Sequence, residues 1–504
     1  MTNQREKRNE ASLPHSVFSA DWLRKAERQA AQETGISLFT LMQRAAKAAF
    51  LLAQREFPHT RHWLILCGHG NNGGDGFEMA RLAKSAGIRV TLLAVERSKP
   101  LPDEAEMART GWLKSGGEIN SDDSAWPDDA DLIIDGLLGT GLSSAPRAPY
   151  DGLIDATNSA SLPVISLDIP SGLDAQTGQT AGKAVHATHT VSFIALKPGL
   201  LTGQARDYTG KLHCDALGLQ SWLGGHLAAL QRLDASQLGT WLHPRRPCSH
   251  KGEHGRLLVV GGDIGFAGAI RMASEAALRT GAGLVRVLTH KEHAGPLLTA
   301  RPELMVQELT AASLDEGLEW ADVLVIGPGL GQKEWGKQAV ERAAKWDKPA
   351  LWDADALNLL AINPGKRQNR VLTPHPGEAA RLLGCSVKEI ESDRLLSAQK
   401  LTERYGGVVV LKGAGSLIAS EHGEMALADV GNAGMASGGM GDVLSGIIGG
   451  LLAQKLNIYD AACAGSVVHG AAADEIAHRQ GTRGMLATDL LAVIAPLVNP
   501  DLKK

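Results

Sequence analysis

Several features that mark secreted, zinc-binding or membrane proteins are missing from this 504-residue sequence. Its five cysteines are odd in number, widely spaced and form no C-x-x-C pair. This argues against a disulfide framework or a zinc site and favours a reducing compartment. The longest apolar run, residues 443–452, is interrupted by serine and glycine and is too short to span a bilayer. Residues 1–9 are polar and charged, without the apolar stretch of a signal peptide. We therefore expect a cytoplasmic protein.

An excess of positive charge is also missing. Lysine and arginine number 51, aspartate and glutamate number 55, and the net charge is −4. Such a chain has no general attraction for nucleic acid or anionic membranes, so we expect neither as a partner. Any anionic small molecule must be held by local backbone dipoles and a few placed side chains. Exposed faces of α/β domains often self-associate, so we expect a homo-oligomer.

The sequence does contain a repeated alternation of short apolar runs and helical stretches. A chain of this length is too long for one hydrophobic core, so we expect two domains. A helical pattern over residues 20–57 comes first. Strands are then predicted at residues 63–67, 90–95, 132–134, 164–167 and 191–196, and, after the Pro-rich stretch 243–247, at 256–260, 284–288, 323–326, 350–352, 371–373 and 408–412. This order is typical of mostly parallel sheets covered on both faces. We predict an α/β protein of two three-layer domains, residues 1–225 and 226–504.

The first glycine-rich motif follows the first predicted strand. Gly68, Gly70 and Gly73 match G-x-G-x-x-G before a helix predicted at residues 77–86, and Glu96 ends the next strand. In parallel sheets ligands bind at the carboxyl ends of the strands, and this motif is typical of dinucleotide binding at a helix N-terminus. A tight structural turn is the alternative interpretation.

Three aspartates, Asp75, Asp135 and Asp168, also follow predicted strands and should meet in one crevice. Carboxylates beside a polyanionic ligand repel it unless a cation, ribose hydroxyls or a raised pKa compensates. Asn72 and Ser171 would complete an oxygen site for a hard cation with Asp135. The alternative is that some of these aspartates only cap helices.

These segments, G-N-N-G-G-D-G, D-G-L-L-G-T-G and L-D-I-P-S-G-L-D, together resemble the YjeF N-terminal family, the NAD(P)H-hydrate epimerases. The resemblance implies a Rossmann-like fold, a potassium ion at Asn72, Asp135 and Ser171, and Asp168 as the acid–base residue. The substrate-binding residues that it implies are Asn71, Asn72, Gly73, Gly74, Asp75, Gly139, Thr140, Gly141, Leu142, Ser143, Ser144, Ala145 and Asp168. His69 stands where the family usually has proline.

A second glycine cluster, residues 432–442, precedes an apolar helical segment. Its glycines can turn backbone N–H groups inward, and the helix start adds positive potential, which predicts an anion site. An aspartate at its mouth, Asp442, suits proton removal from an attacking hydroxyl. The alternative is an ordinary helix cap. Lys412, Asp353 and His375 follow other predicted strands, and His375 is either a structural or a binding residue.

This set is similar to the ribokinase-like superfamily, and its G-N-x-G-M-A-S-G-G-M-G-D and T-P-H-P-G-E motifs resemble the ADP-dependent NAD(P)H-hydrate dehydratases. The resemblance implies that the adenine nucleotide is bound by Lys412, Gly413, Ala414, Gly415, Ser416 and Gly441. It places the hydrated substrate at Ala269, Gly329, His375 and Asp442, with Asp442 catalytic and Mg²⁺ as cofactor.

Joined in this order, the halves are similar to bifunctional enzymes that repair hydrated NAD(P)H. Such an enzyme interconverts the two C6 epimers in one domain (an isomerase) and dehydrates the S epimer with ADP in the other (a lyase). Two other functions stay open from the residues alone. One is an NAD-dependent dehydrogenase fused to a small-molecule kinase, which leaves Asn72 and the Asp135–Ser171 pair unexplained. The other is a first domain that only binds a ligand or a partner.

Overall fold

The computed structural model describes residues 12–95, 99–142 and 144–500, so Glu96 and Ser143 lie outside the described residues. The chain divides into two compact units between Gln231 and Arg232. Each unit is an α/β structure built on a mostly parallel sheet, which confirms the predicted fold class. Among the described residues, no single helix is long and apolar enough to cross a membrane, although α1 and α2 taken together pass that test by length and composition.

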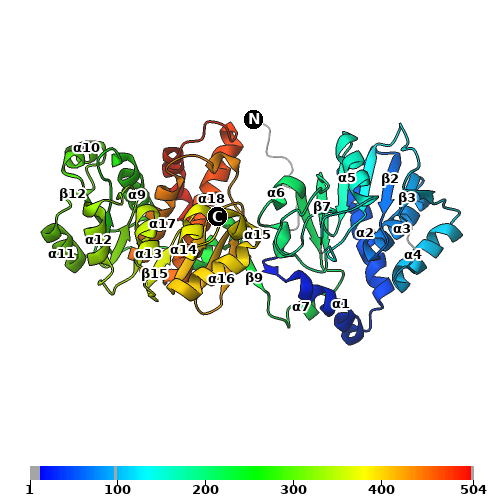
Figure 1. Ribbon diagram of the computed structural model, residues 1–504, viewed down its shortest axis with the longest axis horizontal. Helices are drawn as coiled ribbons and strands as arrows, with labels where there is room; N and C mark the ends of the chain where they lie inside the picture. The colour runs from blue at the N-terminus through cyan, green and yellow to red at the C-terminus, as the bar shows by residue number, and fades with distance from the viewer. Residues whose placement is uncertain (1–11, 96–98, 143, 501–504) are drawn as a thin grey trace. The chain divides into compact units, whose positions relative to one another are not determined.

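The first unit is built on a parallel sheet with the order β4-β3-β2-β5-β6-β7-β8 (Figure 1). Its strands are β2 (His62–Cys67), β3 (Arg89–Ala94), β4 (Asn120–Ser121), β5 (Leu132–Gly136), β6 (Val164–Leu167), β7 (His189–Phe193) and β8 (Lys211–Asp215). Its helices are α1 (Ala20–Thr34), α2 (Leu38–Glu56), α3 (Asn71–Ser85), α4 (Asp103–Lys114), α5 (Tyr150–Ser159), α6 (Ala205–Tyr208) and α7 (Gln220–Leu223).

Side chains of β2 show why this sheet is covered on both faces. Trp63 and Ile65 belong to the apolar cluster that includes residues of α2, α3 and α4. Leu64 and Leu66 point the other way, into a second cluster that includes residues of α5. Because successive side chains of a strand alternate between faces, a strand that is apolar throughout must be buried on both. The result is the predicted three-layer arrangement.

Residues 20–57, for which the sequence predicts a helical pattern, form two helices and not one continuous element. Two helices, α1 and α2, meet at an angle of 110°. Gly35 ends α1 in the left-handed conformation with φ 70°, and the hydroxyl of Ser37 accepts a hydrogen bond from Thr40 N to start α2. A left-handed glycine followed by a serine N-cap stops one helix and begins another. This bend lets α1 form one wall of the cavity described below.

The second unit has the sheet order β18-β17-β16-β15-β14-β13-β10-β11-β12. Its strands are β10 (Arg256–Val260), β11 (Leu284–Thr289), β12 (Met305–Glu308), β13 (Val323–Ile326), β14 (Ala350–Trp352), β15 (Arg370–Leu372), β16 (Val408–Leu411), β17 (Ser416–Ser420) and β18 (Met425–Ala428). The pairings of β16, β17 and β18 are antiparallel and the others parallel. At the division between the units, β9 (Leu230–Leu233) pairs with the short β1 (Ser16–Val17).

Most helices of the second unit lie between its strands in the sequence. Its helices are α8 (Leu238–Trp241), α9 (Ala267–Thr280), α10 (Ala294–Ala300), α11 (Ala311–Trp320), α12 (Glu334–Ala343), α13 (Ala354–Ile362), α14 (Pro376–Leu383), α15 (Val387–Ser392), α16 (Arg394–Tyr405), α17 (Met440–Ala453), α18 (Ile458–Gln480) and α19 (Leu491–Leu497).

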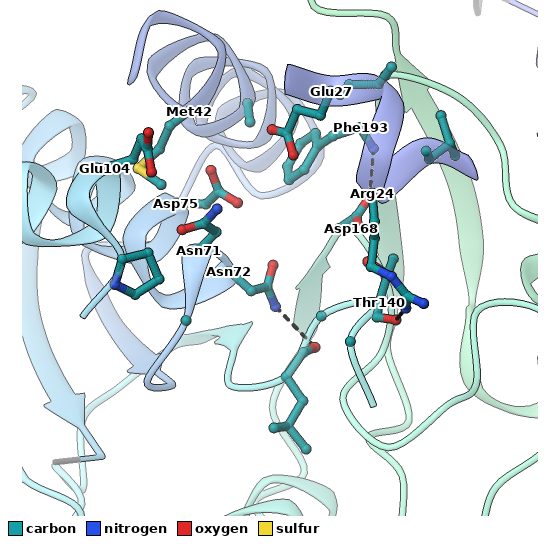
Figure 2. Close-up of a pocket in the computed structure, with 18 of the residues that line it drawn as sticks. Arg24, Glu27, Met42, Asn71, Asn72, Asp75, Glu104, Thr140, Asp168 and Phe193 are labelled. Atoms are coloured by element: carbon teal, nitrogen blue, oxygen red, sulfur yellow. Dashed lines mark hydrogen bonds between the residues drawn. The ribbon is translucent and has the colours of Figure 1, made fainter. Parts of the chain in front are cut away.

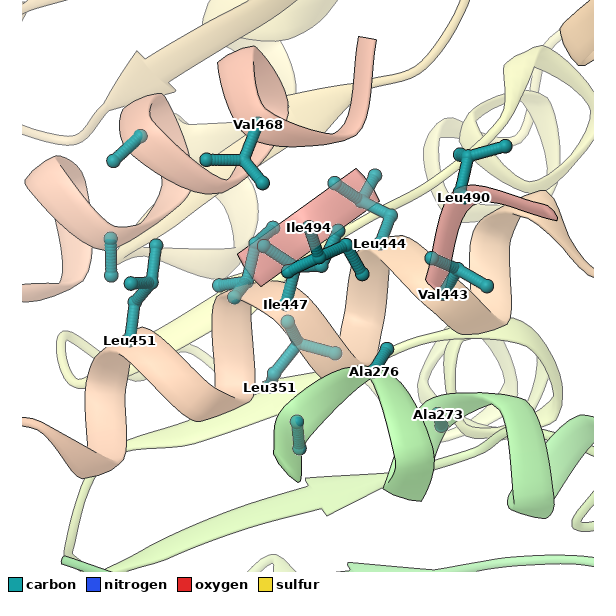
Figure 3. Close-up of a cluster of buried hydrophobic side chains, with 14 of the residues drawn as sticks. Ala273, Ala276, Leu351, Val443, Leu444, Ile447, Leu451, Val468, Leu490 and Ile494 are labelled. Carbon is teal, nitrogen blue, oxygen red and sulfur yellow. The ribbon is translucent and has the colours of Figure 1, made fainter. Parts of the chain in front are cut away.

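Helix α17 lies at the centre of the second unit's core. Val443, Leu444, Ile447 and Leu451 are buried against α9, α18 and α19 (Figure 3). A Cβ on Gly446 would overlap the carbonyl oxygen of Ala273, so glycine at this position permits the close approach of α17 to α9. A helix that is apolar on every face belongs inside a protein. This packing fixes the start of α17, where the second glycine cluster ends.

Candidate active sites

The first unit contains a cavity of about 930 Å³ at the carboxyl ends of β2, β5 and β6 (Figure 2). The predicted substrate residues that line it are Asn71, Asn72, Asp75, Gly139, Thr140, Gly141, Leu142, Ser144 and Asp168. Gly73, Gly74 and Ala145 are not among the lining residues. The cavity therefore gathers side chains from three separate sequence motifs.

The glycines of the first motif are explained largely by backbone packing. A Cβ on Gly68 would overlap the carbonyl oxygen of Leu137, and one on Gly73 would overlap that of Gly68. On Gly74, a Cβ would lie 2.5 Å from Cε of Met42 in α2. The turn is thus tight for structural reasons, and α3 begins at Asn71, six residues before the predicted start.

Asp168 is held at the cavity surface by an unusual set of contacts. Its backbone has φ 63°, a conformation that non-glycine residues rarely adopt. Phe193 N donates to Oδ1 at 2.9 Å, and the ammonium of Lys197 forms an ion pair with the same oxygen. Lys197 is only 2% exposed and also donates to Ser192 Oγ and the Phe193 carbonyl, both at 3.0 Å. The carboxylate is therefore fixed in position.

Lys197 was not identified from the sequence. It follows the predicted strand at residues 191–196, so the rule that drew attention to the aspartates also applies to it. A buried lysine is rare unless it is paired, and here the partner is Asp168.

Three further carboxyl groups, those of Glu27, Asp75 and Glu104, face the same cavity (Figure 2). Burial raises the pKa of Asp75 well above its ordinary value, and the negative charges of Asp168 and Glu27 raise it further. The pKa of Glu27 is raised in the same way, first by burial and then by Asp168. Glu27 comes from α1, ahead of the recognised motifs, and was missed. The cavity thus contains carboxyl groups whose surroundings favour the neutral form.

The prediction that Asp135 joins the other two aspartates at the crevice is wrong. Asp135 is fully buried and does not line the cavity. Its carboxylate accepts hydrogen bonds from Ser171 Oγ at 2.5 Å, Ser166 Oγ at 2.7 Å and Ser171 N at 2.9 Å. Burial raises the pKa of Asp135, while these hydrogen bonds oppose the shift.

Asn72 and Ser171 meet around the backbone of Leu138. Asn72 Nδ2 donates to the Leu138 carbonyl at 3.1 Å, and Leu138 N donates to Ser171 Oγ at 2.8 Å. Asn72 Oδ1 is buried and has no hydrogen-bond partner among the described residues. A buried acceptor without a partner is costly, which indicates that something else satisfies it.

In the second unit, predicted residues gather at the start of α17. Lys412 Nζ lies 3.0 Å from Asp353 Oδ1 and 3.9 Å from Glu378 Oε2. Ser445 Oγ donates to Asp353 at 2.7 Å. A Cβ on Gly441 would lie 3.2 Å from Lys412 Nζ, so the second glycine cluster lies beside the end of β16.

Asp442 lies beside this group of charges. Burial raises its pKa to about 7, the negative charges of Asp353 and Glu378 add to the shift, and Lys412 opposes it. The interpretation of Asp442 as a helix cap is wrong, because Gly439 occupies the N-cap of α17 and Asp442 lies three residues further on. A carboxyl group with a pKa near neutrality suits proton transfer.

His375 has a structural contact and an exposed ring. It occupies the N-cap of α14, where its Nδ1 accepts a hydrogen bond from Gly377 N at 3.0 Å. Its side chain is nevertheless 49% exposed. Gly329 has φ 59°, and a Cβ there would lie 2.7 Å from Cβ of Phe266 and 3.2 Å from that of Ala269. Gly329 and Ala269 are therefore neighbours, as a shared site requires.

Comparison with known proteins gives each unit a family. Residues 38–199 match the family model described as YjeF-related protein N-terminus, and residues 257–496 match that of NAD(P)H-hydrate dehydratase. The chain is 64% identical over 501 residues to the bifunctional NAD(P)H-hydrate repair enzyme Nnr of Escherichia coli (strain K12), covering 99% of this chain and 97% of that protein. It is 46% identical to the bifunctional NAD(P)H-hydrate repair enzyme of Leishmania braziliensis, covering 97% and 95% respectively.

Solved structures show the fold of the second unit. A ribokinase-like superfamily protein from Enterococcus faecalis is 29% identical and has a TM-score of 0.51, covering 55% of this chain and 97% of that one.

The repair enzymes that match nearly the full chain rule out a dehydrogenase fused to a kinase and a first domain without catalytic activity. Instead, the two units join an epimerase to a dehydratase, and the chain belongs to the family of bifunctional NAD(P)H-hydrate repair enzymes.

Proposed function

We propose that the two units act on one hydrated dinucleotide in turn. The first unit interconverts the R and S epimers of the hydrate at C6. The second unit uses ADP to remove the C6 hydroxyl of the S epimer, giving NAD(P)H, AMP and phosphate. The observation that carries this proposal is the presence in one chain of two acid-bearing sites, the Asp168 cavity and the Asp442 cluster.

In the first unit, Asp168 moves the proton during inversion at C6. Lys197 and Phe193 N fix the orientation of its carboxylate toward the cavity, so the acid–base group is held in place before substrate binds. The residues from Asn71 to Asp75 and from Gly139 to Ala145 bind the hydrate. The residues of these two ranges that line the cavity support their assignment to substrate binding. Gly73 and Gly74 do not line it and contribute by allowing the close packing of α3.

A potassium ion in the first unit fits the residues that gather around Leu138. Asn72 Oδ1 lacks a partner among the described residues, and Asp135 and Ser171 provide further oxygen atoms close by. Hard cations prefer oxygen ligands, and a cation would offset the negative charge of Asp135. When bound, the ion would stabilise the loop after β5. Replacing potassium by choline in the buffer should lower epimerisation without affecting dehydration, and an unchanged rate would contradict the assignment.

In the second unit, Asp442 takes the proton of the C6 hydroxyl. The hydroxyl oxygen then attacks the terminal phosphorus of ADP, and the bond from that phosphorus to the bridging oxygen breaks to release AMP. The C6–O bond of the phosphate ester breaks next, assisted by the lone pair of the ring nitrogen, and loss of a proton from C5 restores NAD(P)H. Phosphate is a far better leaving group than hydroxide, because the pKa of water is about 15.7.

The loop between β16 and β17 holds the nucleotide in this proposal. Lys412 provides a cation, and Gly413, Ala414, Gly415, Ser416 and Gly441 provide backbone groups near the phosphates. Mg²⁺ fits this site because it is bound mainly by substrate phosphates with one or two carboxylates, and Asp353, Glu378 and Asp442 lie close to Lys412. When bound, it would neutralise charge on the transferring phosphoryl group. Ala269, Gly329 and His375 bind the hydrate.

The absorbance of NADH at 340 nm tests the whole proposal. Hydrated NADH mixed with the protein and ADP should regain this absorbance without any oxidisable substrate, and AMP should form in equal amount. With Asp168 intact, both epimers should be consumed. Hydride transfer to an added substrate without any recovery from the hydrate would overturn the proposal.

A further inference from the structure

Three cations on α1 line the cavity of the first unit: Arg24, Lys25 and Arg28. All three are exposed on a helix whose other face buries Leu23 and Ala26. The guanidinium of Arg24 crosses to the loop after β5 and donates to the carbonyl of Thr140 (Figure 2). The three cations therefore line the substrate cavity, and Arg24 contacts its opposite rim.

The charges of the cavity make this placement important. Its described lining includes the carboxyl groups of Glu27, Asp75, Glu104 and Asp168, and each of these that is ionised opposes the binding of a phosphate-bearing ligand. Of the lysines and arginines in that lining, Lys197 is paired with Asp168, Arg24 is paired with the exposed Asp21 of α1, and Lys25 and Arg28 are the others. In the glycine turn, close backbone packing accounts for Gly68 and Gly73, whereas Gly70 lines the cavity with open space beside it.

We propose that α1 binds the phosphate groups of the hydrated dinucleotide through Arg24 and Arg28, with Lys25 adding positive charge. This inference rests on the proposed function of the first unit. Arg24 and Arg28 are four residues apart and so lie on one face of the helix. A guanidinium presents a planar fork of donors that matches two phosphate oxygens. Because α1 precedes residues 38–199, this recognition element lies outside the region matched by the family model.

Kinetics of the full-length R24Q/R28Q double variant test the proposal. The variant removes charge-assisted contacts to phosphate, so KM for hydrated NADH and for hydrated NADPH should rise at least about tenfold, with kcat within about twofold. Inhibition by ADP-ribose should weaken to a similar extent. The hydrate of reduced nicotinamide riboside has no phosphate, and its kcat/KM should not change. The R24K/R28K variant should recover part of the affinity, and raising the ionic strength should reduce the difference from wild type.

The matched control is K47Q, which removes a cation from an exposed position of α2 that does not line the cavity. It should leave every constant unchanged. A rise in KM for both dinucleotides assigns the cations to the diphosphate, and a rise confined to the NADPH hydrate assigns them to the 2′-phosphate. Either result supports the proposal. Unchanged KM values, or an equal loss with the riboside, would overturn it. Absence of epimerisation by the wild-type protein would instead refute the function on which the inference rests.

Discussion

The two sites use the same functional group, and the protein constrains it in different ways. Asp168 follows β6 and has a strained backbone conformation, and its carboxylate is fixed by a buried lysine and a backbone N–H. Asp442 lies in the first turn of α17, among other carboxyl groups, and its pKa is raised to about 7. In the first site the protein controls where the carboxylate points, and in the second it controls when the carboxyl group ionises. The environment of an aspartate, and not its presence after a strand, determines which task it can perform.

The largest expected effect is that of Asp442→Asn. An amide of the same shape cannot accept the proton of the C6 hydroxyl, and acid–base groups contribute roughly 10²–10⁴-fold in rate. ADP-dependent recovery of absorbance at 340 nm should fall by about this factor, while epimer exchange measured by chromatography stays at the wild-type rate. Equal loss of both activities would mean that the two sites are not independent.

The next effect is that of Asp168→Asn on epimerisation. A loss of roughly 10²-fold or more is expected, because the proton carrier is removed while the cavity keeps its shape. Dehydration of purified S epimer should not change. Epimer exchange at the wild-type rate would show that Asp168 is not the acid–base residue.

Lys197→Met sharpens the comparison further. If Lys197 is the positioning residue for Asp168, its loss should lower kcat of epimerisation roughly tenfold or more, with little change in KM, because orientation contributes to the reaction step. Lys197→Arg should recover part of the rate. A change in KM alone would assign Lys197 to substrate binding.

The pH dependence should differ between the sites. As pH falls through about 7, the Asp442 carboxylate takes up a proton and can no longer act as a base, so kcat/KM of dehydration should fall about tenfold per pH unit. Above that pH the rate should level off. A dehydration profile that stays flat from pH 8 to pH 5.5 would contradict the role of Asp442.

The smallest effect concerns stability. In Gly446→Ala, the new methyl group would overlap the carbonyl oxygen of Ala273 and push α17 away from α9, at a cost of about 1–3 kcal/mol. The melting temperature of the second unit should fall by several degrees, whereas Gly70→Ala in the first unit, with open space around it, should cost less. Equal losses would contradict this view of α17.

Much of both sites could be predicted from the sequence, because strand ends and glycine runs are local features. Asp168, Lys412 and Asp442 all follow this pattern, and most predicted strands lie within a residue or two of their observed positions. The antiparallel strands β17 and β18 were missed although they are as long as several predicted strands, and β17 directly follows the glycine loop at residues 413–415. The helical pattern was predicted from the apolar spacing within residues 38–49, and the break marked by Gly35 and Ser37 was not predicted, although a glycine followed by a serine is a signal of it.

Other features depend on the fold and have no local sequence pattern. Glu27, Arg24 and Arg28 reach the first site only because α1 bends back at Gly35. The burial of Asp135 depends on three hydrogen bonds from residues more than 30 positions away. The raised pKa of Asp442 comes from its burial and from Asp353 and Glu378, which lie on other elements.

The central position of α17 has a consequence for heat inactivation. Its first turn carries Asp442, and its remaining turns form the middle of the apolar core. Asp442 is therefore held by the same core that stabilises the second unit. Loss of dehydratase activity on warming should coincide with the calorimetric unfolding of the second unit, while the first site, which depends on loops and on α1, should lose activity before its own unit unfolds.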